Sequence, residues 1–194
     1  MKIGIDIDGV LTNEHDYIIN NGTKYFAEKN IPYKVSINIY DSPELFNVSK
    51  ENYNMFWGYH LIDYFVNIPT RQYAKEIIKK LKEEGNEIYI ITARPFTYTE
   101  SKFKEDMINI TKEWLAKNEI YYDELVFSNT KLEDCNRIGI DIMIEDKPAN
   151  ILSVSKSIPV ICYDQPYNKE IIKENIYRCY SWYDIYKFLK AFNK

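Results

Sequence analysis

Residues 1–12 read MKIGIDIDGVLT, and this stretch decides how the rest of the chain can be organised. The short run of β-branched residues at 3–7 predicts a buried strand. Asp6 and Asp8 stand one residue apart near the carboxyl end of that run, so strand alternation would put both side chains on one side. Gly9 then allows a sharp turn without a side-chain clash. The stretch therefore predicts two neighbouring carboxylates at a strand end.

Two carboxylates on one side of a strand repel each other unless a positive charge lies beside them. Mg²⁺ suits such a pair, because it typically takes one or two carboxylates together with a phosphate group and waters. An Asp-Gly turn with an exposed aspartate beside it is the alternative, since Asp-Gly is also a common turn signal. The residues that follow the other predicted strands decide between these two interpretations.

The composition limits the classes of protein to consider. The chain has 194 residues, of which 45% are hydrophobic, and this is enough for one well-filled core with an insertion. The net charge of −4 argues against a surface for nucleic-acid polymers or membranes, but it allows one small phosphorylated substrate. No stretch is apolar enough to span a bilayer or resembles a signal peptide. Three widely spaced cysteines favour a reducing compartment, so we expect a cytoplasmic protein.

Apolar runs alternate with amphipathic stretches along most of the chain. After the first strand, we expect strands at 87–92, 124–127, 141–145 and 158–163. We expect helices at 71–84, with Thr70 as the cap, at 99–117, after Lys131, after Pro148 and from Ser181 onward. This order predicts an α/β fold, namely a Rossmann-like parallel sheet with helices on both faces.

The interval between the first two strands is too long for a simple crossover. A crossover needs about a dozen residues, and the predicted helix at 71–84 already provides them. Residues 13–69 are therefore surplus, and they contain turn signals and two helix-like stretches. We expect residues 1–12 and 70–194 to form a catalytic core. Residues 13–69 are expected to form a small, mainly helical cap over the strand ends.

Polar side chains follow each of the first four predicted strands. In open α/β sheets, ligands bind just outside the carboxyl ends of the strands. The first strand is followed by the acid pair Asp6 and Asp8, and the second by the hydroxyl of Thr92, Ala93 and the guanidinium of Arg94. The third is followed by the ammonium of Lys131, and the fourth by the acid pair Glu145 and Asp146. The sequence therefore predicts one site in which Mg²⁺ and a lysine offset the carboxylates and attract a phosphate group.

This set of residues suits phosphoryl transfer, which needs mainly positioning and charge stabilisation. Asp6 can act as a nucleophile, and Asp8 can donate and accept the proton. Thr92 and Lys131 would bind the transferring group, while Asp146 would complete the metal site.

Several assignments stay open at this point. Lys147 competes with Lys131 as the cation of the site. Glu145 either binds the metal or pairs with Lys147, and Arg94 either contacts the phosphate or pairs with a carboxylate of the cap. A group of cap side chains either stacks on a nucleobase or forms the core of the cap, and we favour the second role. The group consists of Tyr53, Phe56, Trp57, His60 and Tyr64.

Four stretches resemble the four motifs of the haloacid dehalogenase (HAD) superfamily of phosphatases: 6–12 (DIDGVLT), 90–92 (IIT), Lys131 and 144–146 (IED). The resemblance implies a Rossmann-like core with a helical cap between the first two motifs. It also implies Asp6 as nucleophile, Asp8 as general acid and base, and Mg²⁺ held by Asp6, the backbone carbonyl of Asp8 and Asp146.

Within the superfamily, residues 92–94 (TAR) and 144–148 (IEDKP) are most similar to the 5′(3′)-deoxyribonucleotidase branch and its bacterial relatives. That branch often carries Asp-Asp where this chain has Glu145-Asp146, and the longer Glu145 could hold a metal-bound water. The resemblance implies a Mg²⁺-dependent nucleotidase for nucleoside monophosphates. The alternatives are a phosphatase for sugar phosphates or other small metabolites and a non-catalytic module that binds metal or phosphate. A homodimer is also left open.

Overall fold

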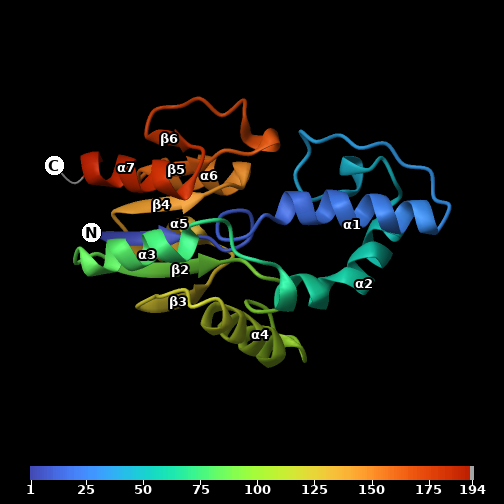
Figure 1. The fold of residues 1–194 in the computed structure, drawn as a ribbon, viewed down its shortest axis with the longest axis horizontal. Helices are drawn as coiled ribbons and strands as arrows, with labels where there is room; N and C mark the ends of the chain where they lie inside the picture. Colours follow the sequence, from blue (N-terminus) through green and yellow to red (C-terminus); the bar gives the residue numbers. More distant parts are fainter. Residues whose placement is uncertain (193–194) are drawn as a thin grey trace.

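The computed structural model describes residues 1–192 and contains one sheet in which all neighbouring strands are parallel (Figure 1). The strand order is β3-β2-β1-β4-β5-β6, so the chain moves outward from β1 in one direction and then in the other. The strands are β1 (Lys2–Ile5), β2 (Glu87–Thr92), β3 (Glu124–Phe127), β4 (Ile142–Glu145), β5 (Val160–Tyr163) and β6 (Ile176–Cys179). The predicted fold class, a Rossmann-like parallel α/β sheet, is confirmed.

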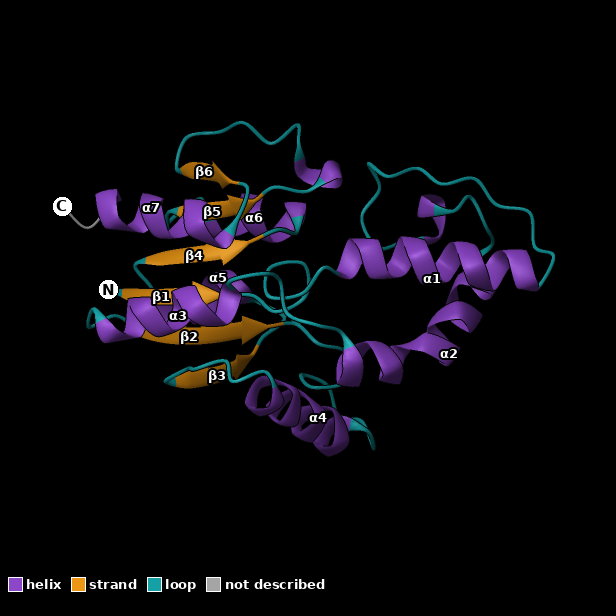
Figure 2. Cartoon of the chain, viewed as in Figure 1, coloured by secondary structure: helices purple, strands orange, loops and turns teal. Residues whose placement is uncertain are grey.

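Helices cover both faces of this sheet (Figure 2). On one face, α3 (Ala74–Glu83) packs beside α7 (Trp182–Phe192), and α4 (Lys104–Lys117) adds side chains to the same apolar cluster. On the other face, α5 (Lys131–Ile138) packs beside α6 (Pro148–Val154). Within residues 1–192, none of the helices has the length and apolar character that crossing a membrane requires.

Alternate residues of β2 face the two helical layers. Ile88 and Ile90 join the cluster that contains α3 and α7, whereas Tyr89 and Ile91 join the cluster that contains α5 and α6. All four side chains are buried, and burying a large apolar side chain stabilises a fold by about 1.5–3 kcal/mol. A strand that is buried on both faces has a continuous apolar sequence, which is why its position could be predicted.

The first strand is shorter than expected. Because β1 ends at Ile5, Asp6 is the first residue beyond the strand and Asp8 lies in the following loop. The loop turns tightly, since the carbonyl of Ile7 accepts a hydrogen bond from the backbone N–H of Leu11 (2.8 Å). The prediction that strand alternation places both aspartates on one side is therefore wrong. The turn after the strand is what brings them to one cleft.

Two predicted helices begin later than expected. α3 begins at Ala74 and not at Arg71, because Thr70 pairs with Thr12 in an isolated antiparallel bridge and does not cap the helix. α4 likewise begins only at Lys104.

The sixth strand was not predicted from the sequence. β6 lies at the edge of the sheet, where Tyr177 is exposed. Arg178 points to the loop before the strand, and its Nη1 donates hydrogen bonds to Asp164 Oδ1 (2.7 Å) and Asn168 Oδ1 (2.8 Å). An edge strand with two polar or exposed residues in the middle lacks the apolar run by which the inner strands are recognised.

Residues 13–69, called the insertion below, form a helical layer beyond the carboxyl ends of the strands (Figure 1). They contain α1 (Glu14–Glu28), the 3₁₀ helix η1 (Pro43–Leu45) and α2 (Lys50–Asn67). These elements share an apolar cluster of their own, which includes Ile18, Phe26, Leu45, Phe46, Tyr53 and Phe56. The division of the chain into a core and a cap stays a prediction, and this separate cluster supports it.

Specific contacts attach the insertion to the rest of the molecule. The bridge between Thr12 and Thr70 joins the two chain segments where they enter and leave the insertion. Arg71 Nε donates a hydrogen bond to the carbonyl of Thr12 (2.9 Å), and Trp114 Nε1 donates one to the carbonyl of Ile68 (2.8 Å). Both ends of the insertion are thus fixed close to the carboxyl end of β1.

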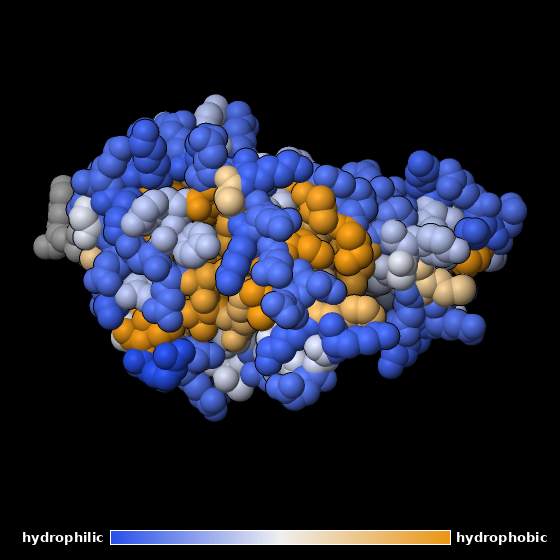
Figure 3. All heavy atoms as spheres, turned by 90° about the horizontal axis from the view of Figure 1, so that it is seen from below, coloured by the Kyte–Doolittle hydropathy of each residue, from blue (hydrophilic) through white to orange (hydrophobic). Residues whose placement is uncertain are grey.

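An apolar groove of about 750 Å³ lies between α2 and α4. Its lining includes Leu61, Ile62, Phe96, Phe103, Met107 and Ile110. Figure 3 shows apolar side chains gathered in patches on the face where α4 lies. Because Leu61 also lines the cleft described below, the groove and the cleft adjoin each other along α2.

Candidate active site

A cleft of about 530 Å³ opens at the carboxyl ends of the central strands, between the sheet and the insertion. Five of the predicted site residues line it, namely Asp6, Asp8, Thr92, Ala93 and Lys131. The other three, Arg94, Glu145 and Asp146, are fully buried next to it. The structure thus brings side chains from four strand ends to one place, although only part of the set faces the cleft.

Asp6 follows β1 directly, and its side chain is almost fully buried. Its Oδ1 accepts a hydrogen bond from the backbone N–H of Ile7 (2.8 Å) and forms an ion pair with Lys131 Nζ (2.8 Å). Its Oδ2 accepts no hydrogen bond from the described part of the chain, residues 1–192. Burial raises the pKa of Asp6 to about 8, and the negative charge of Glu145 adds to this effect. A carboxylate in this position is stabilised by additional positive charge.

Asp8 is held by donors from two directions. The hydroxyl of Tyr64, on α2, lies 2.8 Å from Asp8 Oδ1. Arg94 Nη2 lies 3.2 Å from the same oxygen, and Arg94 Nε lies 3.3 Å from Oδ2. Tyr64 belongs to the insertion and Arg94 to the loop after β2, so the orientation of Asp8 depends on both parts of the molecule.

Arg94 has a different partner from the two that were expected. We expected it to contact phosphate or to pair with a carboxylate of the cap, but it pairs with Asp8 of the core. Its guanidinium lies over the rings of Phe65 (4.6 Å) and Trp114 (5.5 Å), and the side chain is fully buried. The aromatic rings of α2 and α4 therefore enclose Arg94 behind Asp8, away from the open cleft.

Lys131 and Glu145 form a buried pair beneath the cleft. Lys131 is the first residue of α5, and its Nζ lies 2.7 Å from Glu145 Oε2 and 2.8 Å from Asp6 Oδ1. Glu145 also accepts hydrogen bonds from Asn150 Nδ2 (3.1 Å) and from the backbone N–H groups of Asp146 (3.0 Å) and Lys147 (2.9 Å). Burial opposes the charge of Glu145, but Lys131 holds the pKa of Glu145 below its usual value. Both oxygens of Glu145 are thus already occupied.

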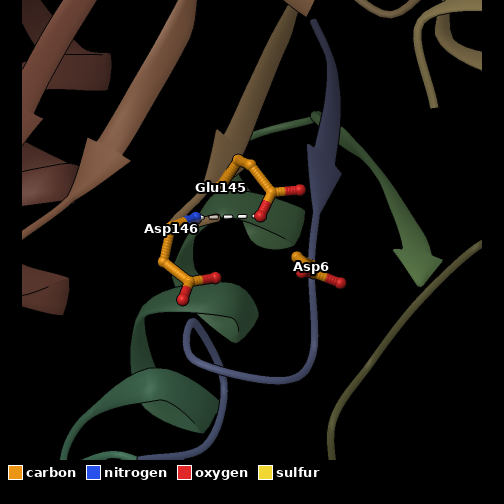
Figure 4. Close-up of side chains that lie close together, drawn as sticks. All are labelled: Asp6, Glu145 and Asp146. Carbon is orange, nitrogen blue, oxygen red and sulfur yellow. Dashed lines mark hydrogen bonds between the residues drawn. The ribbon is translucent and has the colours of Figure 1, made fainter. Parts of the chain in front are cut away.

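Asp146 lies across from Asp6, as Figure 4 shows. Its Oδ2 accepts a hydrogen bond from the Tyr167 hydroxyl, whereas Oδ1 is buried without a hydrogen-bond partner among residues 1–192. Burial, with the charges of Glu145 and Asp6, raises the pKa of Asp146 well above its usual value. One carboxylate oxygen each of Asp6, Glu145 and Asp146 lies within 4.8 Å of the other two. An unpartnered buried carboxylate oxygen in such a group fits a hard cation such as Mg²⁺.

Thr92 provides a second unpartnered polar atom beside the cleft. Its Oγ1 is buried at the end of β2 and, within the described residues, has no hydrogen-bond partner. A buried hydroxyl without a partner costs free energy unless a ligand supplies one. Thr92 can thus donate a hydrogen bond to a phosphate oxygen in the cleft.

Gly9 is required by the close approach of Asp146. Its backbone has φ +91°, and a Cβ at this position would lie 2.0 Å from Asp146 Oδ2. We expect Gly9→Ala to lower the free energy of unfolding by more than about 1 kcal/mol, because a left-handed backbone disfavours alanine and Asp146 must move. Urea unfolding of both proteins in EDTA measures this change. Gly58→Ala, where nothing lies within 4 Å of the added Cβ, is the matched control, and an equal effect of both substitutions would contradict the prediction.

Sequence reasoning missed several residues of the cleft. From the insertion come Glu14, Tyr40 and Asp41, and from the core comes Asn150. The Tyr167 hydroxyl, which holds Asp146 beside the cleft, was also missed. No periodic pattern links these residues to the four motifs, so the sequence carried no signal for them. Of the two lysines that competed for the site, Lys131 contacts Asp6, whereas Lys147 lines the cleft near the Tyr40 ring (5.2 Å).

The cap side chains divide between the two roles that were considered. Tyr53 and Phe56 lie in the apolar cluster of the insertion, as favoured. Trp57 packs against that cluster but also lines the cleft. Tyr64 is buried with its hydroxyl on Asp8. Only part of this group can therefore contact a substrate.

The chain is similar to known proteins over nearly its whole length. Residues 1–193 match the family described as "5' nucleotidase, deoxy (Pyrimidine), cytosolic type C protein". Nucleotidase CA_C3379 from Clostridium acetobutylicum is 31% identical over 194 residues, covering 96% of this chain and 92% of that protein. A Bacillus subtilis protein named "Putative nucleotidase YqfW" is 30% identical over 189 residues, covering 94% of this chain and 90% of that protein.

The fold is shared with solved structures. A crystal structure described as that of "a predicted phosphatase from Clostridium acetobutylicum" superposes with a TM-score of 0.67, covers 98% of both chains and is 17% identical. At this identity the likeness concerns the fold alone, whereas the family match extends over nearly the whole sequence. The chain therefore belongs to the family of 5′ nucleotidases, deoxy (pyrimidine), cytosolic type C, within the HAD superfamily, and it is a phosphoric monoester hydrolase.

Proposed function

We propose that the protein is a Mg²⁺-dependent nucleotidase that hydrolyses nucleoside monophosphates through an aspartyl-phosphate on Asp6. The observation that carries the proposal is the meeting of four strand ends around one cleft. Among residues 1–192, Asp6 Oδ2, the hydroxyl of Thr92 and Asp146 Oδ1 have no hydrogen-bond partner, and together with the ammonium of Lys131 they lie in the cleft or directly beneath it. This combination suits the binding and transfer of a phosphoryl group.

Asp6 and Asp146 are the side chains that would hold Mg²⁺. Glu145 is close enough to share the ion, but its two oxygens already accept hydrogen bonds from Lys131, Asn150 and two backbone N–H groups. We therefore assign Glu145 the role of positioning Lys131. When bound, Mg²⁺ would offset the charge of the carboxylates and of the incoming phosphate.

The first half of the reaction uses Asp6 and Asp8. Oδ2 of Asp6 attacks the phosphorus atom, a P–O bond forms, and the bond to the ester oxygen breaks. The departing alcohol oxygen takes a proton from Asp8. The hydroxyl of Thr92 and the ammonium of Lys131 donate hydrogen bonds to the phosphoryl oxygens. These donors stabilise the negative charge on the oxygens in the transition state.

The second half releases inorganic phosphate. Asp8, now a carboxylate, takes a proton from a water molecule that attacks the phosphorus atom. The bond between phosphorus and Asp6 Oδ2 breaks, and Asp6 returns to its starting form. Arg94 and Tyr64 keep Asp8 in place through both halves, because they donate hydrogen bonds to its oxygens.

The family membership and the size of the cleft support a nucleotide as substrate. The cleft has about 530 Å³, which leaves room for more than a phosphate group. Trp57 and Phe65, both on α2, line the cleft, and such aromatic rings provide a surface for a nucleobase. Sugar phosphates and other small phosphorylated metabolites are the alternative substrates.

Hydrolysis of a panel of phosphate esters tests the proposed function. We expect nucleoside monophosphates to have the highest kcat/KM in the presence of Mg²⁺. Removal of the metal with EDTA should lower the rate by at least roughly 10²-fold, because the carboxylates then repel the substrate, and added Mg²⁺ should restore it. Release of inorganic phosphate measures the rate. A preference for sugar phosphates would refute the nucleotidase assignment, and full activity in EDTA would refute the metal dependence.

The cysteines support the cytoplasmic location that we expected. Cys135, Cys162 and Cys179 are buried and unpaired. Burial raises the pKa of each thiol to about 12, so the reactive thiolate is scarce at neutral pH. Three unpaired thiols are typical of proteins that work in a reducing compartment.

A further inference from the structure

We propose that Tyr167 is a positioning residue that sets the metal preference of the site, because its hydroxyl occupies one oxygen of Asp146 and leaves the other for Mg²⁺. This inference rests on the proposed Mg²⁺ site, and it adds a residue that none of the four motifs contains. It concerns the ion alone, so it can be tested in the absence of a substrate.

The two oxygens of Asp146 have different surroundings. Oδ2 accepts a hydrogen bond from the hydroxyl of Tyr167, and a Cβ on Gly9 would lie 2.0 Å from the same oxygen. Oδ1 is buried and has no hydrogen-bond partner among residues 1–192. Burial and the charge of Asp146 raise the pKa of Tyr167 well above its usual value, so the hydroxyl keeps its proton and remains a donor. The carboxylate is thus held on one side and free on the other.

The backbone around Tyr167 is fixed to the loop that carries Asp146. Tyr167 lies in the 3₁₀ helix η2 (Pro166–Asn168), which follows β5. The fully buried side chain of Asn168 donates a hydrogen bond from Nδ2 to the carbonyl of Asp146 (2.8 Å). Arg178 holds η2 from the side of β6, because its Nη2 donates a hydrogen bond to the carbonyl of Asn168 (2.9 Å). The hydroxyl of Tyr167 therefore reaches Asp146 from a well-anchored segment.

Two rings of the insertion pack on the ring of Tyr167. The ring centroids of His15, on α1, and of Tyr40 each lie 5.0 Å from that of Tyr167, and both contacts are edge-to-face. His15 is 4% exposed, and its Nε2 has no hydrogen-bond partner within the described residues. The contact between His15 and Tyr167 is therefore one of packing. The insertion thus helps to place the hydroxyl that holds Asp146.

A carboxylate with one available oxygen suits Mg²⁺ better than Ca²⁺. Ca²⁺ takes more oxygen ligands than Mg²⁺ and often binds both oxygens of one carboxylate, whereas Mg²⁺ requires a nearly octahedral set at shorter distances. Binding through both oxygens of Asp146 would have to break the hydrogen bond from Tyr167. Such a bond also fixes the orientation of a ligating carboxylate, and its loss typically lowers metal affinity by roughly 10–100-fold. The geometry therefore favours the smaller ion.

Tyr167→Phe tests this inference, because it removes the hydroxyl and keeps the ring that packs on the insertion. We expect the dissociation constant for Mg²⁺ to rise about tenfold, since Asp146 loses its fixed orientation. The constant for Ca²⁺ should change by less than about threefold, because the second oxygen of Asp146 becomes a ligand for this larger ion. Isothermal titration of the metal-free protein with MgCl₂ and with CaCl₂, without substrate, measures both constants.

Two further variants complete the experiment. Tyr186→Phe is the matched control, because the Tyr186 hydroxyl also donates to a carboxylate, Glu84 Oε1 (2.6 Å), at the surface of the molecule. It should leave both constants unchanged. His15→Ala keeps the hydroxyl of Tyr167 but removes one of its supports, so the ratio of the Mg²⁺ to the Ca²⁺ constant should rise about threefold. Urea unfolding in EDTA checks that each variant is folded, and if Tyr167→Phe fails this check, the ratio in His15→Ala decides.

The ratio of the two constants separates positioning from a general loss of structure. An unchanged ratio in Tyr167→Phe would overturn the inference even if both ions bind more weakly, because a damaged site affects both ions alike. A wild-type protein that binds neither ion would refute the proposed Mg²⁺ site and this inference together. A protein that prefers sugar phosphates to nucleotides, yet shows the expected change of ratio, would refute the nucleotide substrate and support the role of Tyr167.

Discussion

Asp6→Asn should reduce kcat for p-nitrophenyl phosphate by roughly 10⁴-fold or more, because the reaction loses the oxygen that forms the covalent bond to phosphorus. An amide oxygen is a far weaker nucleophile than a carboxylate, and the other groups of the cleft only bind and orient the ester. Steady-state release of p-nitrophenol with saturating Mg²⁺ measures the effect. The wild-type protein, quenched in acid during turnover, should also retain phosphate that the variant does not.

The fold should survive this substitution. Burial and Glu145 disfavour the charge of Asp6, so a neutral side chain of the same shape removes repulsion while it loses the ion pair with Lys131. We therefore expect the free energy of unfolding to change by less than about 1 kcal/mol. Asp106→Asn, at an exposed position of α4, is the matched control and should keep full activity. Turnover at the wild-type rate in Asp6→Asn would exclude Asp6 as the nucleophile.

Lys131 comes after the partly exposed edge strand β3, whereas the positions of Asp6, Thr92 and Asp146 could be predicted because each ends or follows a strand that is buried on both faces. Such strands are visible in the sequence as short apolar runs, and parallel strands bring their carboxyl ends to the same edge of a sheet. Two general rules were thus sufficient to place side chains from a segment of 141 residues, 6–146, at one edge of the sheet. The exact end of β1 did not matter, because the turn after Ile5 compensated for the shorter strand.

The contacts of Arg94 and Glu145 could not be predicted, because those of Arg94 depend on how the insertion packs on the core, and those of Glu145 depend on the turn after β4 and on how α5 and α6 pack beside it. Arg94 is enclosed by one ring from α2 and one from α4, two helices that are far apart in sequence. Glu145 is occupied by four donors, of which two are backbone N–H groups of its own turn. Neither arrangement leaves a periodic pattern in the sequence.

The ion pair between Lys131 and Glu145 links the stability of the core to the chemistry of the site. Both side chains are almost fully buried, so each charge depends on the other for compensation. Lys131 also pairs with Asp6. Burial alone would lower the pKa of Lys131, but the negative charges of Asp6 and Glu145 outweigh this effect and raise it. The lysine therefore stays charged and ready to bind a phosphoryl oxygen.

Lys131→Met should lower the free energy of unfolding by about 3–5 kcal/mol and also abolish most of the activity, because it leaves Glu145 charged and buried without a cation. Urea unfolding in EDTA measures the stability, since bound Mg²⁺ would otherwise mask part of the loss. Adding Glu145→Gln to this variant removes the uncompensated charge, and the neutral amide can still accept from the backbone N–H groups of Asp146 and Lys147. The double variant should regain most of the stability but none of the activity, because the phosphoryl group still lacks its ammonium. Recovery of activity together with stability would show that Lys131 acts only through Glu145 and does not contact the substrate.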